Sequence, residues 1–231
     1  MKRMFLFFVL LILAACAPQA LTEEPANANP TVEDAQSFDS IEDAIIQRLA
    51  ENLGFKKNDI SVKSNVEVEF GDACMDIAFP DAVCAQVVTP GRVIVLEANG
   101  SEYEYRTSVD GDFIQPATFA LIWTREGGIA GFCDRLTMFL SGEIYGMNCR
   151  SQPKEMASNF ATLFSAQDQK QFNAWFLKYG EINLDVSDPE GVSDRMMNTL
   201  VFYGNGSGKA NKADEQALLE WVQSLYQKLY S

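Results

Sequence analysis

The sequence predicts an α+β fold made of two small modules, each with an antiparallel sheet and helical segments, behind an export signal and a flexible tether. Of its 231 residues, 47% are hydrophobic and 22% are charged, which is ordinary for a folded globular chain. Apolar residues recur at helical spacing in some segments and alternate along others. A proline-containing stretch separates an apolar N-terminus from these segments. We therefore expect an N-terminal module over residues 40–115 and a C-terminal module over residues 116–231.

Residues 1–15 have the pattern of an export signal. Lys2 and Arg3 precede an unbroken apolar run. This run is too short for a membrane-spanning helix, which needs about 20 apolar residues. The sequence LAAC at residues 13–16 resembles a bacterial lipobox. The resemblance implies cleavage before Cys16, thioether lipidation of Cys16 and acylation of its new amino group. An ordinary signal peptide followed by a chance cysteine is the alternative.

Residues 16–39 predict a lipidated, disordered tether. They contain three prolines and no lysine or arginine, and such a stretch cannot bury enough apolar surface to offset its ordering entropy. Acyl chains such as palmitate on Cys16 would hold the mature protein on the extracytoplasmic side of a cell membrane or outer membrane. Because Ala17 rather than aspartate follows the cysteine, the outer membrane is favoured in a cell that has two.

The N-terminal module begins with a predicted helix over residues 41–53. Apolar residues fall on one helical face, Ser40 and Asp43 have capping-box spacing, and Gly54 provides the stop. A strand is predicted over residues 60–70, with one face buried. The side chains expected on that face are Ile60, Val62, Val66, Val68 and Phe70.

A hairpin follows in the same module. Asn99-Gly100 separates two alternating segments, 92–98 and 101–107, and this dipeptide is the strongest short-range signal for a hairpin. A two-residue turn places Leu96 opposite Tyr103 and Ile94 opposite Tyr105.

The C-terminal module predicts strands first and helices afterwards. A strand over residues 118–125 and a Gly127-Gly128 turn precede a second hairpin, 135–140 with 143–148, which turns at Ser141-Gly142. Ser165 and Asp168 begin a helix with a buried aromatic row. A strand over residues 196–203 and a helix over 212–230 complete the module. The aromatic row consists of Phe172, Trp175, Phe176 and Tyr179.

The five cysteines agree with an exported protein. The lipobox uses Cys16, and the other four form an even set in a compartment where disulfides persist. Of the three connectivities we favour the local one, because Cys133 and Cys149 flank the second hairpin symmetrically. Zinc is disfavoured, since the spacing is not C-x-x-C and no histidine is present. The expected pairs are Cys74 with Cys84 and Cys133 with Cys149.

Several segments resemble a known group of proteins. The runs DAC at residues 72–74, CAQVVTPG at 84–91 and GSEYEYRT at 100–107 look like a module of uncharacterised bacterial envelope lipoproteins, and GGIAGFCD at 127–134 looks like its common companion. Together they cover nearly all of the mature chain. The resemblance implies an envelope location, and it transfers no catalytic residue.

Charge and composition exclude several classes of function. The formal net charge of −14 disfavours nucleic-acid partners, because phosphate backbones are bound by clusters of lysine and arginine. The absence of histidine removes Ser-His and Cys-His pairs, His-ligated zinc and histidine bases. We therefore expect no cofactor and no enzyme activity.

Three loops are candidates for chemistry. An acidic loop offers oxygen ligands of the kind that calcium binds, but its spacing matches no EF-hand, so a solvated loop is favoured. Residues 204–209 carry glycines and a lysine but not the order of a phosphate-binding loop, and a flexible connection is expected there. Residues 127–131 predict a structural turn rather than a contact surface. The acidic loop carries Asp185, Asp188, Glu190 and Asp194.

The function predicted from the sequence is that of a noncatalytic, membrane-anchored binding or interaction module whose partner is an envelope protein or a glycan. One alternative is an inhibitor of extracytoplasmic proteases that presents the loop between Cys74 and Cys84. Another is a hydrolase that uses paired carboxylates.

Overall fold

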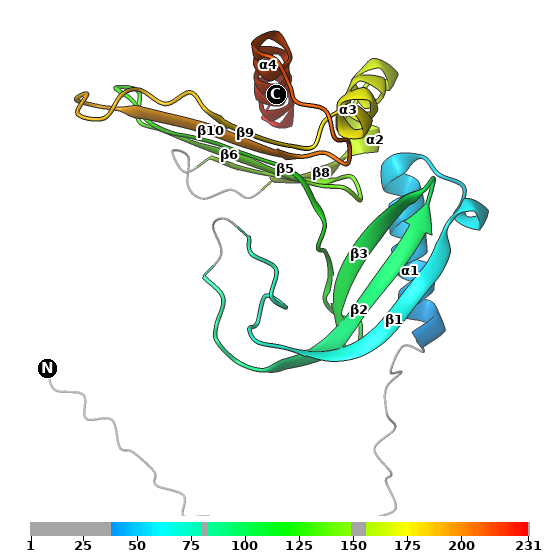
Figure 1. Ribbon diagram of the computed structural model, residues 1–231. Helices are drawn as coiled ribbons and strands as arrows, with labels where there is room; N and C mark the ends of the chain where they lie inside the picture. Colours follow the sequence, from blue (N-terminus) through cyan, green and yellow to red (C-terminus); the bar gives the residue numbers. More distant parts are fainter. Residues whose placement is uncertain (1–37, 80–82, 149–155, 231) are drawn as a thin grey trace, which may run out of the picture. The chain divides into compact units, whose positions relative to one another are not determined.

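The computed structural model describes residues 38–79, 83–148 and 156–230 (Figure 1). These residues form an α+β fold with two antiparallel sheets, as the sequence predicted. The first sheet has the strand order β1-β2-β3-β4, and the second has the order β8-β7-β6-β5-β10-β9. The predicted signal, Cys16 and the rest of the predicted tether up to residue 37 lie outside the described residues, whereas the last two tether positions, Phe38 and Asp39, belong to the first helix. Within the described residues no helix is long and apolar enough to cross a membrane.

The helix α1 (Phe38–Leu53) covers one face of the first sheet (Figure 1). Its buried side chains include Ile41, Ile45 and Leu49. The helix starts earlier than predicted, so Ser40 lies inside it and is not the N-cap. Capping-box spacing alone does not decide which residue of a first turn begins the helix. At the other end, Gly54 has φ +71° and stops the helix as predicted.

The first sheet consists of β1 (Ser61–Phe70), β2 (Thr89–Ala98), β3 (Ser101–Ser108) and β4 (Ile114–Pro116). The short helix η1 (Lys57–Asp59) precedes it. The β2–β3 hairpin has the predicted register, with Leu96 opposite Tyr103 and Ile94 opposite Tyr105. These four side chains are buried in the core under α1. Both turn residues have positive φ, 54° for Asn99 and 75° for Gly100, as a two-residue hairpin turn requires.

The predicted buried face of β1 is only partly right, because Ile60 and Phe70 are buried whereas Val62 and Val66 are exposed. The register against β2 shifts between Val62 and Ser64, so the strand bulges there and its alternation reverses. Beyond the bulge Asn65 lies on the face under α1, where its amide donates to Glu42 Oε1 at 2.7 Å. Val66 consequently lies on the opposite face, with 53% of its surface exposed. A strict period of two cannot anticipate an inserted residue.

The second sheet contains the strands that the sequence predicted and two that it did not. Asp134 pairs with Asn148 across the β6–β7 hairpin, which is the predicted register, and the turn lies at Ser141-Gly142. The predicted strands are β5 (Phe119–Gly127), β6 (Phe132–Phe139), β7 (Glu143–Asn148) and β10 (Met196–Tyr203). The strands β8 (Met156–Asn159) and β9 (Glu181–Asp185) are too short to stand out as periodic segments.

Three helices lie on one face of the second sheet (Figure 1). They are α2 (Phe160–Leu163), α3 (Ala166–Lys178) and α4 (Lys212–Leu229). The predicted capping box of α3 is confirmed, because the Ser165 side chain accepts from the Asp168 backbone and the Asp168 side chain accepts from the Ser165 backbone. The aromatic row of α3 is buried in the core of this module, as predicted.

Two hydrophobic cores result, one under α1 and one between the second sheet and its helices. Leu53 at the end of α1 and Leu140 after β6 pack against both cores. The junction of the two sheets therefore lies at these two leucines, and the concave surface described next surrounds it.

Candidate functional site

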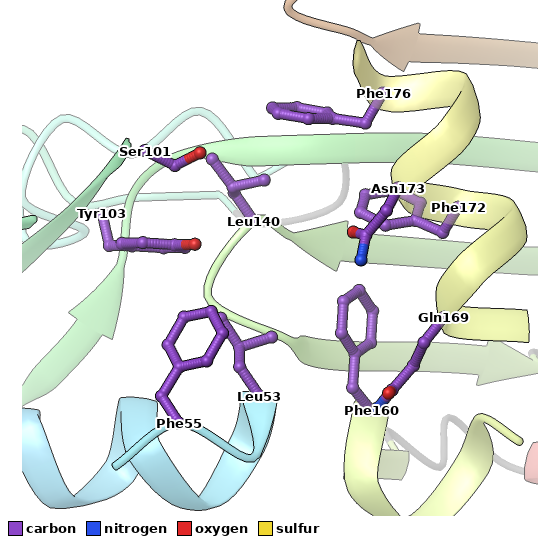
Figure 2. Close-up of a pocket in the computed structure, with 10 residues that line it drawn as sticks. All are labelled: Leu53, Phe55, Ser101, Tyr103, Leu140, Phe160, Gln169, Phe172, Asn173 and Phe176. Carbon is purple, nitrogen blue, oxygen red and sulfur yellow. The ribbon is translucent and has the colours of Figure 1, made fainter. Parts of the chain in front are cut away.

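A cavity of about 90 Å³, here called the recess, opens at the junction of the two cores (Figure 2). Aromatic side chains from β3, α2 and α3 face one another across Leu140 in this view. Its polar lining comes from Ser101, Gln169 and Asn173. The remaining lining side chains are Leu53, Phe55, Tyr103, Leu140, Phe160, Phe172 and Phe176.

Local sequence places these side chains. The stop at Gly54 turns the chain so that Phe55 packs edge-on against the Tyr103 ring, with centroids 6.3 Å apart. The Asn99-Gly100 turn sets Tyr103 and Ser101 at the start of β3. The capping box starts α3 at Ala166, so its aromatic row presents Phe172 and Phe176 to the recess as well as to the core.

A larger open depression, here called the groove, continues from the recess. Its volume is about 630 Å³, and it shares Ser101, Leu140 and Phe176 with the recess. The groove runs between the tip of the β2–β3 hairpin and the ends of β5 and β10 of the second sheet. Its other lining residues are Gly100, Glu102, Ala117, Thr118, Phe119, Tyr203, Gly204 and Asn205.

The lining of the recess and groove is nearly neutral. Glu102 is the one carboxylate among these lining residues, and it forms an ion pair with Lys63. That hydrogen-bonded pairing raises the pKa of Lys63. Burial raises the pKa values of Tyr103 and Tyr203, so both phenols are uncharged at neutral pH. A surface of this kind can bind a ligand through apolar contact and neutral hydrogen bonds.

Residues 204–209 support one wall of the groove and are not the flexible connection that the sequence suggested. The Asn205 backbone amide donates to Phe176 O, Gly206 to Tyr179 O and Gly208 to Lys178 O, at distances of 2.7 to 3.0 Å. These amides satisfy the last carbonyls of α3. A Cβ on Gly206 would lie 2.3 Å from the Lys178 carbonyl carbon, so the glycine permits a close approach of two backbones.

An ion pair with a buried carboxylate lies beside the junction. Arg48 Nε of α1 is 2.7 Å from Glu143 Oε1 of β7, and the carboxylate side chain is only 6% exposed. The Ser141 hydroxyl donates to the other carboxylate oxygen. The Asn52 amide of α1 donates to Ser141 O at 3.3 Å. Burial raises the pKa of Glu143 although the Arg48 charge opposes this shift. The sequence had no signal for this pair, because its members are far apart in the chain.

The predicted Cys74–Cys84 disulfide is confirmed, with a Cα–Cα distance of 5.5 Å. Cys133 is also disulfide-bonded, but Cys149, the partner predicted for it, lies outside the described residues. Asp72, Cys74 and Cys84 form the one group of potential metal ligands found in the described residues. Both sulfurs are already bonded to each other, which leaves no thiolate for a metal.

The loop closed by that disulfide is anchored to the second sheet. The Phe79 ring packs edge-on against the rings of Phe119 and Phe139, with centroid distances of 6.4 and 5.8 Å. Val83 is fully exposed on the same loop, but the intervening residues 80–82 lie outside the described residues. Its protease-inhibitor role stays a sequence prediction.

The acidic residues proposed for calcium are used within the β9–β10 connection. Asp185 Oδ1 accepts from the Ser187 backbone at 3.0 Å, and Asp188 Oδ2 accepts from the Met196 backbone at 2.9 Å. Together with Glu190 and Asp194, these residues are not brought within ligating distance of one another as a group. At the neighbouring β5–β6 turn, Ile129 is 95% exposed, while the Gly128 backbone amide donates to Arg195 O.

The comparisons with known proteins concern the first module. Residues 42–116 match a family model described as a domain of unknown function, DUF8738. The match extends from α1 to the last residue of β4, so it spans the helix and the four-stranded sheet. No curated protein and no solved structure matches the chain. The chain is thus similar, over its first sheet module, to the DUF8738 domain.

Proposed function

We propose that this protein is a noncatalytic, lipid-anchored binding module of the extracytoplasmic envelope, and that its ligand binds in the recess and groove. The observation that carries the proposal is the concave surface at the junction, with an apolar floor and polar amides and hydroxyls at its edge. Ligand sites commonly have this composition. An enzyme that relies on paired carboxylates needs a second acid, and Glu102 is the sole carboxylate lining this surface.

Site-specific crosslinking tests the binding role. A photoreactive amino acid at Asn205 is expected to crosslink a ligand when full-length protein is irradiated in host envelopes. Adding Ser101→Trp should abolish the product, because the indole would fill both the recess and the groove. Ser61→Trp is the matched control, since Ser61 is exposed on the same sheet and lines neither.

The crosslinked product is analysed by mass spectrometry, which distinguishes a protein from a glycan adduct. Products that persist with Ser101→Trp, or that form equally from a photoreactive residue at Ser61, would remove the binding role from this surface.

Lipid anchoring is a separate part of the proposal and is supported by the lipobox resemblance around Cys16. Cys16→Ser is expected to release the protein from the membrane fraction, because the acyl chains are attached through the Cys16 thiol. The apolar run of the predicted signal is too short to span the membrane in their place. Fractionation followed by intact-mass measurement checks this. The matched control is Cys74→Ser, which should stay with the membrane. A Cys16→Ser protein that remains bound after a carbonate wash would contradict anchoring at this residue.

A further inference from the structure

We infer that the groove binds an extended, uncharged or basic peptide segment of an envelope protein, with one branched aliphatic side chain inserted in the recess. The inference rests on the proposed binding function and adds the chemical class of the ligand. Four features of the junction support it: the size of the recess, its polar mouth, the open edge of β3 and the local charge.

The recess has the size of one aliphatic side chain. Its volume of about 90 Å³ is well below the about 150 Å³ of apolar cavities that accommodate benzene. A sugar ring or an aromatic side chain would therefore not fit without displacing the lining. Leu140 and Phe172 are among the side chains that would contact the inserted group.

The mouth of the recess and the groove carry neutral groups that both donate and accept hydrogen bonds. They are the amides of Gln169, Asn173 and Asn205 and the hydroxyl of Ser101. A peptide backbone presents the same alternation of donor and acceptor. A fatty acyl chain in the groove would leave these groups without partners, which is unfavourable.

The edge of β3 beside the groove can receive a peptide backbone. Among the described residues β4 pairs with Tyr105, Arg106 and Thr107, and the Ala117 amide donates to Glu104 O at 2.9 Å. The chain then leaves the sheet into β5. Because strand residues alternate, the backbone groups of Glu102 point to the same edge as those of Glu104, beyond the last pair with β4. Glu102 also lines the groove, so an extended segment could continue the sheet there.

Charge narrows the choice further. The chain carries a formal net charge of −14, and the lining of the groove includes one carboxylate, Glu102, which is paired with Lys63, and no lysine or arginine. An acidic peptide or a phosphorylated glycan would be repelled, whereas a neutral or basic segment would not.

Peptide titration tests the inference. The full chain, in a phospholipid nanodisc, is titrated against the dye-labelled peptide acetyl-STLTS-amide, and binding is followed by fluorescence polarisation. We expect the alanine analogue STATS to bind about tenfold more weakly or worse, because three methylene equivalents leave the recess. Methylation of the leucine backbone nitrogen should also weaken binding, since it removes a donor to the strand edge.

Two variants with matched controls tie the signal to the recess. Ser101→Trp on β3 and Asn173→Trp on α3 should each abolish peptide binding, while Ser61→Trp and Ala174→Trp should leave it unchanged. Two filling variants on different elements guard against a folding defect in either, and thermal unfolding of each checks that it folds.

The results separate this inference from the binding function on which it rests. Equal affinity for STLTS and STATS, no binding of any peptide, or binding of chitotriose or dodecanoate alone would overturn the peptide class. If Ser101→Trp still abolished crosslinking from position 205 in those cases, the binding function would stand without the peptide class. Loss of that dependence would remove both.

Discussion

Replacing Arg48 with alanine is expected to lower the free energy of unfolding by about 3 kcal/mol at neutral pH, because the Glu143 carboxylate would stay buried without its counter-charge. The Arg48 side chain is 33% exposed and the Glu143 side chain 6%, so water can solvate the arginine charge but not the carboxylate. Chemical denaturation monitored by tryptophan fluorescence measures the change. Arg135→Ala is the matched control: Arg135 pairs with Glu126, a carboxylate that is 31% exposed, and should lose less than about 1 kcal/mol.

The pH dependence identifies Glu143 as the cause. Burial raises the pKa of Glu143 in the folded protein above its ordinary value of 4.5. Protonation of Glu143 therefore stabilises the folded state fully below pH 4.5, and this stabilisation is lost as the pH rises through the folded-state pKa. The deficit of Arg48→Ala should therefore be small near about pH 4 and grow toward pH 7.

A double-mutant cycle provides the second check on this pair. Glu143→Gln removes the charge that Arg48 neutralises. The double mutant should therefore lose less free energy of unfolding than the sum of the two single mutants, by about 1 kcal/mol or more. A deficit independent of pH, together with additive effects, would mean that Arg48 acts through packing or through its hydrogen bond to Ile114 O instead.

The second large effect is expected at Gly206. Gly206→Ala should destabilise the protein by about 3 kcal/mol, because the new methyl group would meet the Lys178 backbone at 2.3 Å and neither backbone can move without breaking hydrogen bonds. Thermal and denaturant unfolding measure this loss. The neighbouring exposed residue supplies a matched control, since Ser207→Ala should change stability by no more than about 0.5 kcal/mol.

The same substitution reports on the groove. Tyr203 precedes the tight connection and Asn205 lies in it, and both line the groove, so displacement of residues 204–208 should also reduce crosslinking from position 205. Equal stability of the Gly206→Ala and Ser207→Ala variants would show that residues 204–208 rearrange without cost, as expected for the flexible connection that their glycine content suggested.

Elements determined by neighbouring residues were predictable from the sequence. The Asn99-Gly100 turn specifies the register of Leu96 with Tyr103, because a two-residue turn admits one pairing. The capping box at Ser165 specifies the start of α3 through contacts three residues apart. The Cys74–Cys84 disulfide was predictable because Cys133 and Cys149 flank the second hairpin, which leaves Cys74 and Cys84 as the other pair.

The tertiary structure alone decided which face of a strand is buried and where the candidate site lies. The bulge before Ser64 depends on pairing with β2, and the constraint on Gly206 depends on the end of α3. The recess likewise requires β3, α2 and α3 to meet at Leu140. Patterns along a chain report contacts between near neighbours, whereas these features arise from segments that packing alone brings together.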